Sequence, residues 1–162
     1  MGWTEYDARS SITARQMETW ALGQEVFDVL GLERVNTDRV RNIAHLGVST
    51  SGWTFINCQL PVPAPTPYVC LEAPSGVVWN WNMLQGDNTI TGLAEDFAKV
   101  VTQVHNVADT NLRVTGPVAI DCLSAVSNSW YGDYGWRLSM LDTERFTRSW
   151  RGCSWFRNCC AE

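Results

Sequence analysis

The stretch "YVCLEAPSGVVWNWN", Tyr68 to Asn82, decides the fold class of this 162-residue chain. Apolar and polar residues alternate on both sides of Pro74-Ser75-Gly76, and a proline and a glycine so close together are typical of a tight turn. The pattern predicts a β-hairpin, because alternation with a period of two places every second side chain on the same face. The residues expected to share one face are Val69, Leu71, Val77, Trp79 and Trp81.

After the hairpin, strand and helix patterns alternate twice. A short strand is expected at residues 88–90, followed by a helix within residues 91–107. A second strand is expected at residues 112–114, followed by a turn at Gly116-Pro117 and another helix. The apolar stripes expected on these two helices are Leu93, Phe97, Val100, Val101 and Val104, and then Val118, Leu123 and Val126.

Two helices are expected before the hairpin. The first is capped by Ser10 or Ser11 and runs to Leu30, where Gly31 suits a helix end. The second is capped by Asn36 or Thr37 and fades near Gly52. Their expected apolar faces are Met17, Trp20, Ala21, Phe27 and Leu30, and then Val40, Ile43, Ala44 and Val48.

Residues 60–67, "LPVPAPTP", carry four of the six prolines and predict an extended linker between these helices and the hairpin. Helices first, then mixed strands and helices, indicate an α+β fold in which N-terminal helices pack on a small mixed sheet.

Composition limits the classes of partner. A net charge of -5 gives no basic face for nucleic acid, and no apolar run approaches the ~20 residues that span a bilayer. No basic segment followed by an apolar one opens the chain, so we expect a cytoplasmic protein without a membrane partner. Lys99 is the only lysine beside eleven arginines, a bias that suggests a GC-rich, actinobacterium-like source.

Six cysteines are present and none forms a C-x-x-C pair, which favours reduced, buried thiols. A zinc site from Cys153, Cys159 and Cys160 is the alternative. These three lie in residues 129–162, a segment without clear periodicity. That segment is either a divergent extension or the product of out-of-frame reading.

Four ordered segments within residues 3–127 resemble a known family: "ARQMETWALGQEVFDVLG", "RNIAHLGVSTSGWTF", "APSGVVWNW" and "VTQVHNVADTNLRVTGPVA". They are similar to the second half of the mycothiol-dependent maleylpyruvate isomerase-like proteins, actinobacterial proteins sometimes labelled as wyosine-base-formation proteins. The resemblance implies a DinB-like metal-binding four-helix bundle followed by a sterol-carrier-like α+β domain. Residues 1–31 would be a remnant of the last bundle helix, an orphan here, and residues 36–128 the α+β domain.

In the family, an early helix supplies one histidine, and a later helix supplies a glutamate and a histidine four residues further on. The three ligands hold a divalent, zinc-like metal, at which mycothiol reacts. Glu18 matches the glutamate, but Leu22 stands where the histidine is expected, and the early helix is not among these residues. Glu18 is therefore only a remnant ligand, and we expect no cofactor in the isolated chain.

The resemblance also places basic residues of the family at positions 49, 51 and 105, where this chain has Ser49, Ser51 and His105. His105 is thus the only candidate for a catalytic side chain. Trp79 and Trp81 could form the floor of a ligand pocket with His45 nearby. Covering the sheet against a helix is the commoner role for such tryptophans. A nearby carbonyl that accepts a hydrogen bond is the commoner partner for such a histidine.

Two functions follow as expectations. The first is a truncated family member, without catalysis on its own, which acts as a small-molecule-binding or accessory module. The second is a fragment of a metal- and thiol-dependent isomerase or transferase that a partner chain completes. Glu18, Gln24 and Glu25 are expected on a solvated helix face. Self-association or a partner chain would use the face formed by Met17, Trp20, Phe27 and Leu30.

Overall fold

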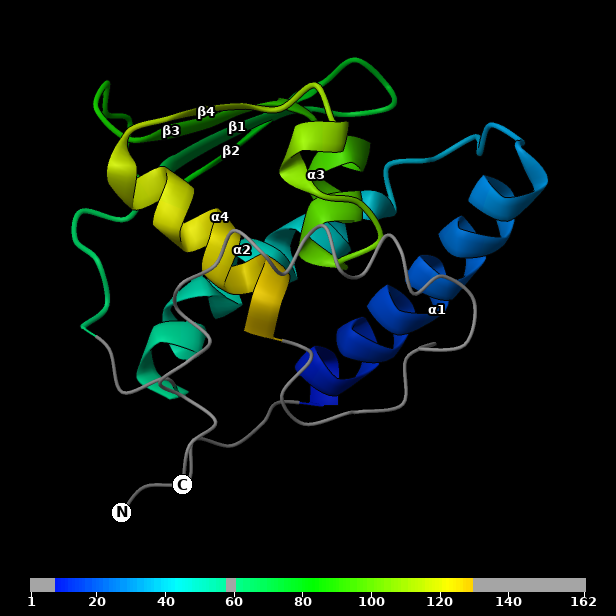
Figure 1. Cartoon of the computed structure of the whole chain (residues 1–162), viewed down its shortest axis with the longest axis horizontal. Coiled ribbons are helices and arrows are strands. Elements are labelled where there is room, and N and C mark those ends of the chain that lie inside the picture. Colours follow the sequence, from blue (N-terminus) through cyan, green and yellow to red (C-terminus); the bar gives the residue numbers. More distant parts are fainter. Residues whose placement is uncertain (1–7, 58–60, 130–162) are drawn as a thin grey trace. The chain divides into compact units, whose positions relative to one another are not determined.

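A computed structural model describes residues 8–57 and 61–129 of the chain (Figure 1). The helices are α1 (Ala8–Leu30), α2 (Val40–Asn57), α3 (Ala94–Val101), the short 3₁₀ helix η1 (Val107–Asp109) and α4 (Pro117–Ser129). The strands are β1 (Tyr68–Glu72), β2 (Val78–Trp81), β3 (Thr89–Leu93) and β4 (Arg113–Thr115). The α+β fold class predicted from the sequence is therefore confirmed for this part of the chain.

The four strands form one mixed sheet in the order β2-β1-β3-β4. β1 pairs with β2 in antiparallel and with β3 in parallel orientation, and β4 pairs with β3 in antiparallel orientation. The predicted hairpin is confirmed, because Val69 pairs with Trp81 and Leu71 with Trp79. Gly76 adopts a φ of 83° in its turn, a conformation that glycine reaches without strain.

One face of the sheet is covered by helices, as Figure 1 shows for α2, α3 and α4. Val69, Leu71 and Ile90 point to this side and are buried. The largest fully buried side chains are Ile43, Leu71, Val100 and Val101. The core of the described residues therefore lies between the sheet and these helices.

Helix α1 packs against α2 with an inner face formed by Met17, Trp20, Ala21 and Gln24. Each of these side chains is less than 9% exposed. The expected solvated position of Gln24 is wrong, because Gln24 is 4% exposed and faces this contact. The expected apolar face is correct only in part, since Leu30 is 63% exposed and Phe27 is half-buried.

Several element ends differ from the expectations. Helix α1 begins at Ala8, so Ser10 and Ser11 lie inside it, and α2 continues past Gly52 to Asn57. Leu93 ends β3 and is 39% exposed, so it does not belong to the stripe of α3.

Helix α3 ends before Val104 because the next turn leaves helical geometry. The backbone N–H of Thr102 donates to Ala98, and Gln103 adopts a φ of 63°. The backbone N–H groups of Val104 and His105 both donate to the carbonyl of Lys99, which closes the helix end. This turn sends His105 back towards α1.

The start of α4 is fixed by a side chain from another element. Asn88 lies just before β3, and its side-chain oxygen accepts a hydrogen bond from the backbone N–H of Val118 at 3.0 Å. The backbone carbonyl of Asn88 accepts a second hydrogen bond, from the backbone N–H of Tyr68. Gly116 allows this approach, because a Cβ at that position would lie 2.0 Å from the carbonyl oxygen of Asp87.

None of the helices in residues 8–57 and 61–129 is long and apolar enough to cross a membrane. The segment 129–162, with Cys153, Cys159 and Cys160, lies beyond the described residues apart from Ser129 at the end of α4.

Candidate functional site

Glu18, which the resemblance matches to a metal ligand, lies on a different side of α1 from its inner face. Its carboxylate pairs with Arg15 at 2.8 Å, and its side chain is 37% exposed. Leu22, one turn further on, is 48% exposed. Among the described residues there is no group of three or more His, Cys, Asp or Glu side chains placed to hold a metal ion. Of the residues that the resemblance matches to metal ligands, the structure describes Glu18 and the non-coordinating Leu22.

The three residues predicted to bind a ligand are brought together by the fold. The indole N–H of Trp81 donates to Nδ1 of His45 at 3.1 Å, and the rings of Trp79 and Trp81 meet edge to face at 6.4 Å. Arg41 of α2 places its guanidinium 5.5 Å from the centre of the Trp79 ring. These contacts join β2 to α2, so the two tryptophans cover the sheet against a helix.

The partner of His45 differs from the expectation. We expected a carbonyl, to which an imidazole N–H would donate, but Nδ1 of His45 accepts from an indole. The imidazole that makes this hydrogen bond is unprotonated at Nδ1. A general base at this position would therefore have its Nδ1 lone pair already engaged.

The catalytic candidate His105 contacts α1 rather than a nucleophile. Its Nε2 lies 2.9 Å from Oδ2 of Asp28. The serines at the other two positions donate within α2, Ser49 to the carbonyl of Leu46 and Ser51 to that of Val48. The structure thus gives His105 a role in joining the end of α3 to α1.

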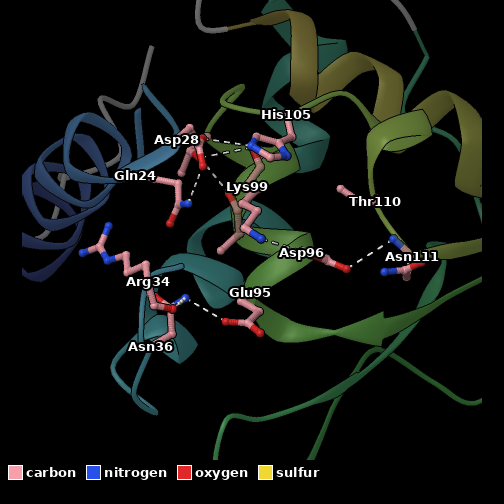
Figure 2. A network of polar contacts seen from close by, with 12 residues as sticks. Gln24, Asp28, Arg34, Asn36, Glu95, Asp96, Lys99, His105, Thr110 and Asn111 are labelled. Carbon is pink, nitrogen blue, oxygen red and sulfur yellow. Dashed lines mark hydrogen bonds and ion pairs between the residues drawn. The ribbon is translucent and has the colours of Figure 1, made fainter. Parts of the chain in front are cut away.

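A polar network that the sequence patterns did not reveal surrounds this pair (Figure 2). The carboxylate of Asp28 also accepts from Nε2 of Gln24 at 2.9 Å. The carbonyl oxygen of the Gln24 side chain is buried and has no hydrogen-bond partner. The sequence does carry one signal for this network. Gln24 and Asp28 follow Ala21 by three and seven residues, a spacing that places polar side chains near the buried face of the helix.

The same network continues through the segment between α1 and α2. Asn36 accepts from the indole N–H of Trp20 at 3.1 Å and donates to Glu95 of α3 at 2.7 Å. Arg34 donates to the carbonyl of Trp20 at 2.8 Å and stacks over its ring at 5.0 Å. Within α3 itself, Nζ of Lys99 lies 3.4 Å from Oδ1 of Asp96. Polar contacts therefore hold α1 to α3 on the side of α1 that faces the core.

A small cavity lies between the sheet and α2, α3 and α4. It offers about 20 Å³ to the centre of a water molecule, which is room for roughly one water. Its lining is mostly apolar and includes Val48, Ser51, Val69, Phe97 and Cys122. Burial raises the pKa of the Cys122 thiol to about 11, with a smaller contribution from Asp121. The thiol is therefore protonated and unreactive near neutral pH.

Comparison with known proteins gives relatives but no family. No family model matches the chain, and no solved structure does. Two curated relatives, from two strains of Mycobacterium tuberculosis and each named only as an uncharacterized protein, are 44% identical over 109 residues. The match covers 67% of this chain and 42% of each relative. The chain thus spans less than half the length of these relatives, which come from an actinobacterium.

Proposed function

We propose that the chain is a maleylpyruvate isomerase-like module without a catalytic metal site of its own, which acts as a small-molecule-binding or accessory unit. The observation that carries the proposal is the composition of the Glu18 face of α1. Glu18 is engaged by Arg15, and the position one turn further on is Leu22, which cannot coordinate a metal. Catalytic zinc sites in proteins use three protein ligands and an open position.

The described residues do not fit the family's metal. One carboxylate on a half-exposed helix face does not hold a transition-metal ion, and the described part of the chain brings no second ligand to it. We therefore derive no chemistry from a metal or from mycothiol for this chain alone.

The cavity between the sheet and α2, α3 and α4 is the place we propose for a small ligand, as a sterol-carrier-like domain would use it. Its lining favours an apolar group, and the protonated Cys122 thiol favours binding by contact rather than by reaction. Because the cavity has room for only about one water, a larger ligand requires the helices that line it to separate.

Hexanoate is a suitable probe for this site, followed by the NMR signals of the cavity methyl groups. We expect saturable shifts at Val48 and Val69, which the Ser51→Leu variant abolishes by filling the cavity. Trp81→Phe is the matched control, because it removes the hydrogen bond to His45 and alters the ring contact with Trp79 but leaves the cavity lining unchanged. Shifts that survive Ser51→Leu would place the ligand elsewhere.

Metal content tests the other half of the proposal. After dialysis against zinc, the chain should retain less than one ion per molecule, and Leu22→His should not turn over maleylpyruvate with mycothiol, because two ligands are still too few. Elemental analysis and a coupled turnover assay measure these quantities. Activity of the Leu22→His variant would show that further ligands come from this chain.

A second candidate function is a fragment that a partner chain completes. It is favoured by the position of Glu18 beside exposed apolar residues of α1, and by the relatives' additional length outside the matched segment. Helices packed on that face would bring their own ligands to Glu18. Mixing the chain with the unmatched part of a mycobacterial relative should then produce zinc binding that Glu18→Gln removes.

A further inference from the structure

The lining of the cavity between the sheet and α2, α3 and α4 divides into a buried floor and a more exposed rim. Val69 and Val101 of the floor are 3% and 0% exposed and belong to the packed core. Val48 and Ser51 of α2 are half-buried, and Asn82, which directly follows β2, is exposed. The cavity therefore opens towards the surface between α2 and Asn82.

Two side-chain hydrogen bonds fasten the loop after β2 to the segment before β1. Nδ2 of Asn82 donates to the carbonyl of Pro67 at 2.7 Å, and Nε2 of Gln85 donates to the carbonyl of Thr66. Pro67 is itself part of the cavity lining. We call residues 82–85 the strap, because these two bonds tie them to the proline-rich segment beside the rim.

The backbone of Asn82 gives the strap its shape. Its φ is 64°, in the left-handed region that asparagine tolerates better than most residues. In this conformation the chain leaves β2 while the side-chain amide reaches the carbonyl of Pro67. Glycine can take the same backbone conformation without strain but has no amide, so the two contributions of Asn82 can be separated experimentally.

The strap is the least firmly held part of the cavity wall. Residues 82–88 and 61–67 belong to neither a helix nor a strand. Met83 and Leu84, in the middle of the strap, are 86% and 80% exposed, so they bury almost no apolar surface. The other walls are helices and strands whose side chains form the core. Segments with few buried apolar contacts open first, so the strap should open more readily than the helices separate.

We propose that the strap is a gate for the cavity, and that release of Asn82 and Gln85 opens the rim to an apolar ligand. The inference rests on the proposed function, because it takes the cavity to be the ligand site. Separation of the helices makes room for the ligand, while the strap sets how fast the ligand enters and leaves.

Cys122 is a natural reporter of this opening. It lines the cavity and is 7% exposed, and burial raises the pKa of its thiol to about 11. Because thiol reagents attack the thiolate, Cys122 should react slowly while the strap is closed. Iodoacetamide is a small neutral reagent, and peptide mass spectrometry follows its reaction at Cys122 separately from the other cysteines. This measurement needs no ligand.

Asn82→Gly should speed the modification of Cys122 by roughly three- to tenfold, a factor that one lost hydrogen bond can supply. Gln85→Ala should act in the same direction. Asn80→Ala is the matched control, because Asn80 is exposed in the same hairpin, accepts a hydrogen bond from Tyr68 and does not line the cavity. Its rate should equal that of the wild type.

Two further measurements separate opening of the strap from unfolding of the chain. Below the unfolding transition, modification through the strap should depend only weakly on urea, because little surface becomes exposed. Modification through unfolding would instead follow the full urea dependence of stability. Adding Ser51→Leu to Asn82→Gly should return Cys122 to slow modification, because the larger side chain fills the route through the cavity.

Equal rates in Asn82→Gly and the wild type would overturn the gate, as would a urea dependence equal to that of global unfolding. The hexanoate titration distinguishes this failure from failure of the ligand site. If hexanoate binds while the rates stay equal, the ligand site stands and the gate is wrong. If the rates respond while hexanoate does not bind, the strap opens as proposed and the ligand assignment is wrong.

Discussion

Gly47 shows how a single missing methyl group sets a helix contact. A Cβ at Gly47 of α2 would lie 2.9 Å from a methyl carbon of Val101, which is fully buried in α3. The two helices approach closely because residue 47 has no side chain. At Gly52 in the same helix, a Cβ would meet its nearest neighbour, a methyl of Val62, at 3.6 Å, an ordinary contact.

We expect Gly47→Ala to lower the free energy of unfolding by about 1–3 kcal/mol, because the extra methyl overpacks the contact between α2 and α3. Gly52→Ala is the matched control and should raise it by about 0.5–1 kcal/mol, because alanine favours the helix. Urea denaturation measures both values. Equal effects of the two substitutions would contradict the packing argument.

Cys122 links burial to alkaline stability. Its thiol has a pKa of about 11 in the folded chain, against 9.0 without burial. Between these values the unfolded chain releases the proton and the folded chain keeps it, so the free energy of unfolding falls as the pH rises from about 9 to about 11. Cys122→Val should show a smaller decline over this range in thermal melts at a series of pH values. An identical decline in both chains would contradict the assignment.

Helix α1 illustrates what an element's sequence can and cannot predict. Its existence and its end at Gly31 follow from periodicity and from one glycine, and both are confirmed. Its orientation was predicted only in part, because two sides of the helix carry apolar residues at helical spacing. The buried side includes the polar Gln24, while the exposed side includes Leu22 and Val26. Only contacts with α2 and α3 decide between them.

Trp20 is the residue through which α1 is held to the rest of the fold. It is 8% exposed, donates to Asn36 and lies under Arg34. Trp20→Ala should therefore lower the free energy of unfolding by about 3–5 kcal/mol. Guanidinium denaturation measures the change, with the exposed Thr19→Ala as control, for which we expect less than about 0.5 kcal/mol. A small effect of Trp20→Ala would mean that α1 contributes little to the stability of the fold.

At the scale of the whole molecule, side-chain contacts join α1 to α3 and to the turn that follows it. Asn36 joins Trp20 to Glu95, and Asp28 meets His105. The sequence could not predict the second contact, because its residues are 77 positions apart and nothing in either local pattern refers to the other. The position of Leu22 needs no such contact to be interpreted, since a leucine side chain has no atom that can coordinate a metal ion.

Hydrogen exchange should show this coupling. We expect the amides of residues 17–28 to be protected about as strongly as those of α2, because both helices open together once their shared contacts break. Asn36→Ala should lower the protection of α1 while that of α4 stays unchanged. Fast exchange throughout α1 in the wild type would show instead that it opens independently.

The contact between Lys99 and Asp96 has a practical consequence for labelling the protein. Lys99 is the only lysine of the chain, and its side chain is 21% exposed beside the Asp96 carboxylate. An amine-reactive dye has only this ammonium group and the α-amino group to modify, and the latter reacts first near neutral pH because its pKa is about 7.7–8.0. Blocking the α-amino group first and then raising the pH would place one fluorophore on α3, where its emission reports separation of α1 from α3 without any engineered residue.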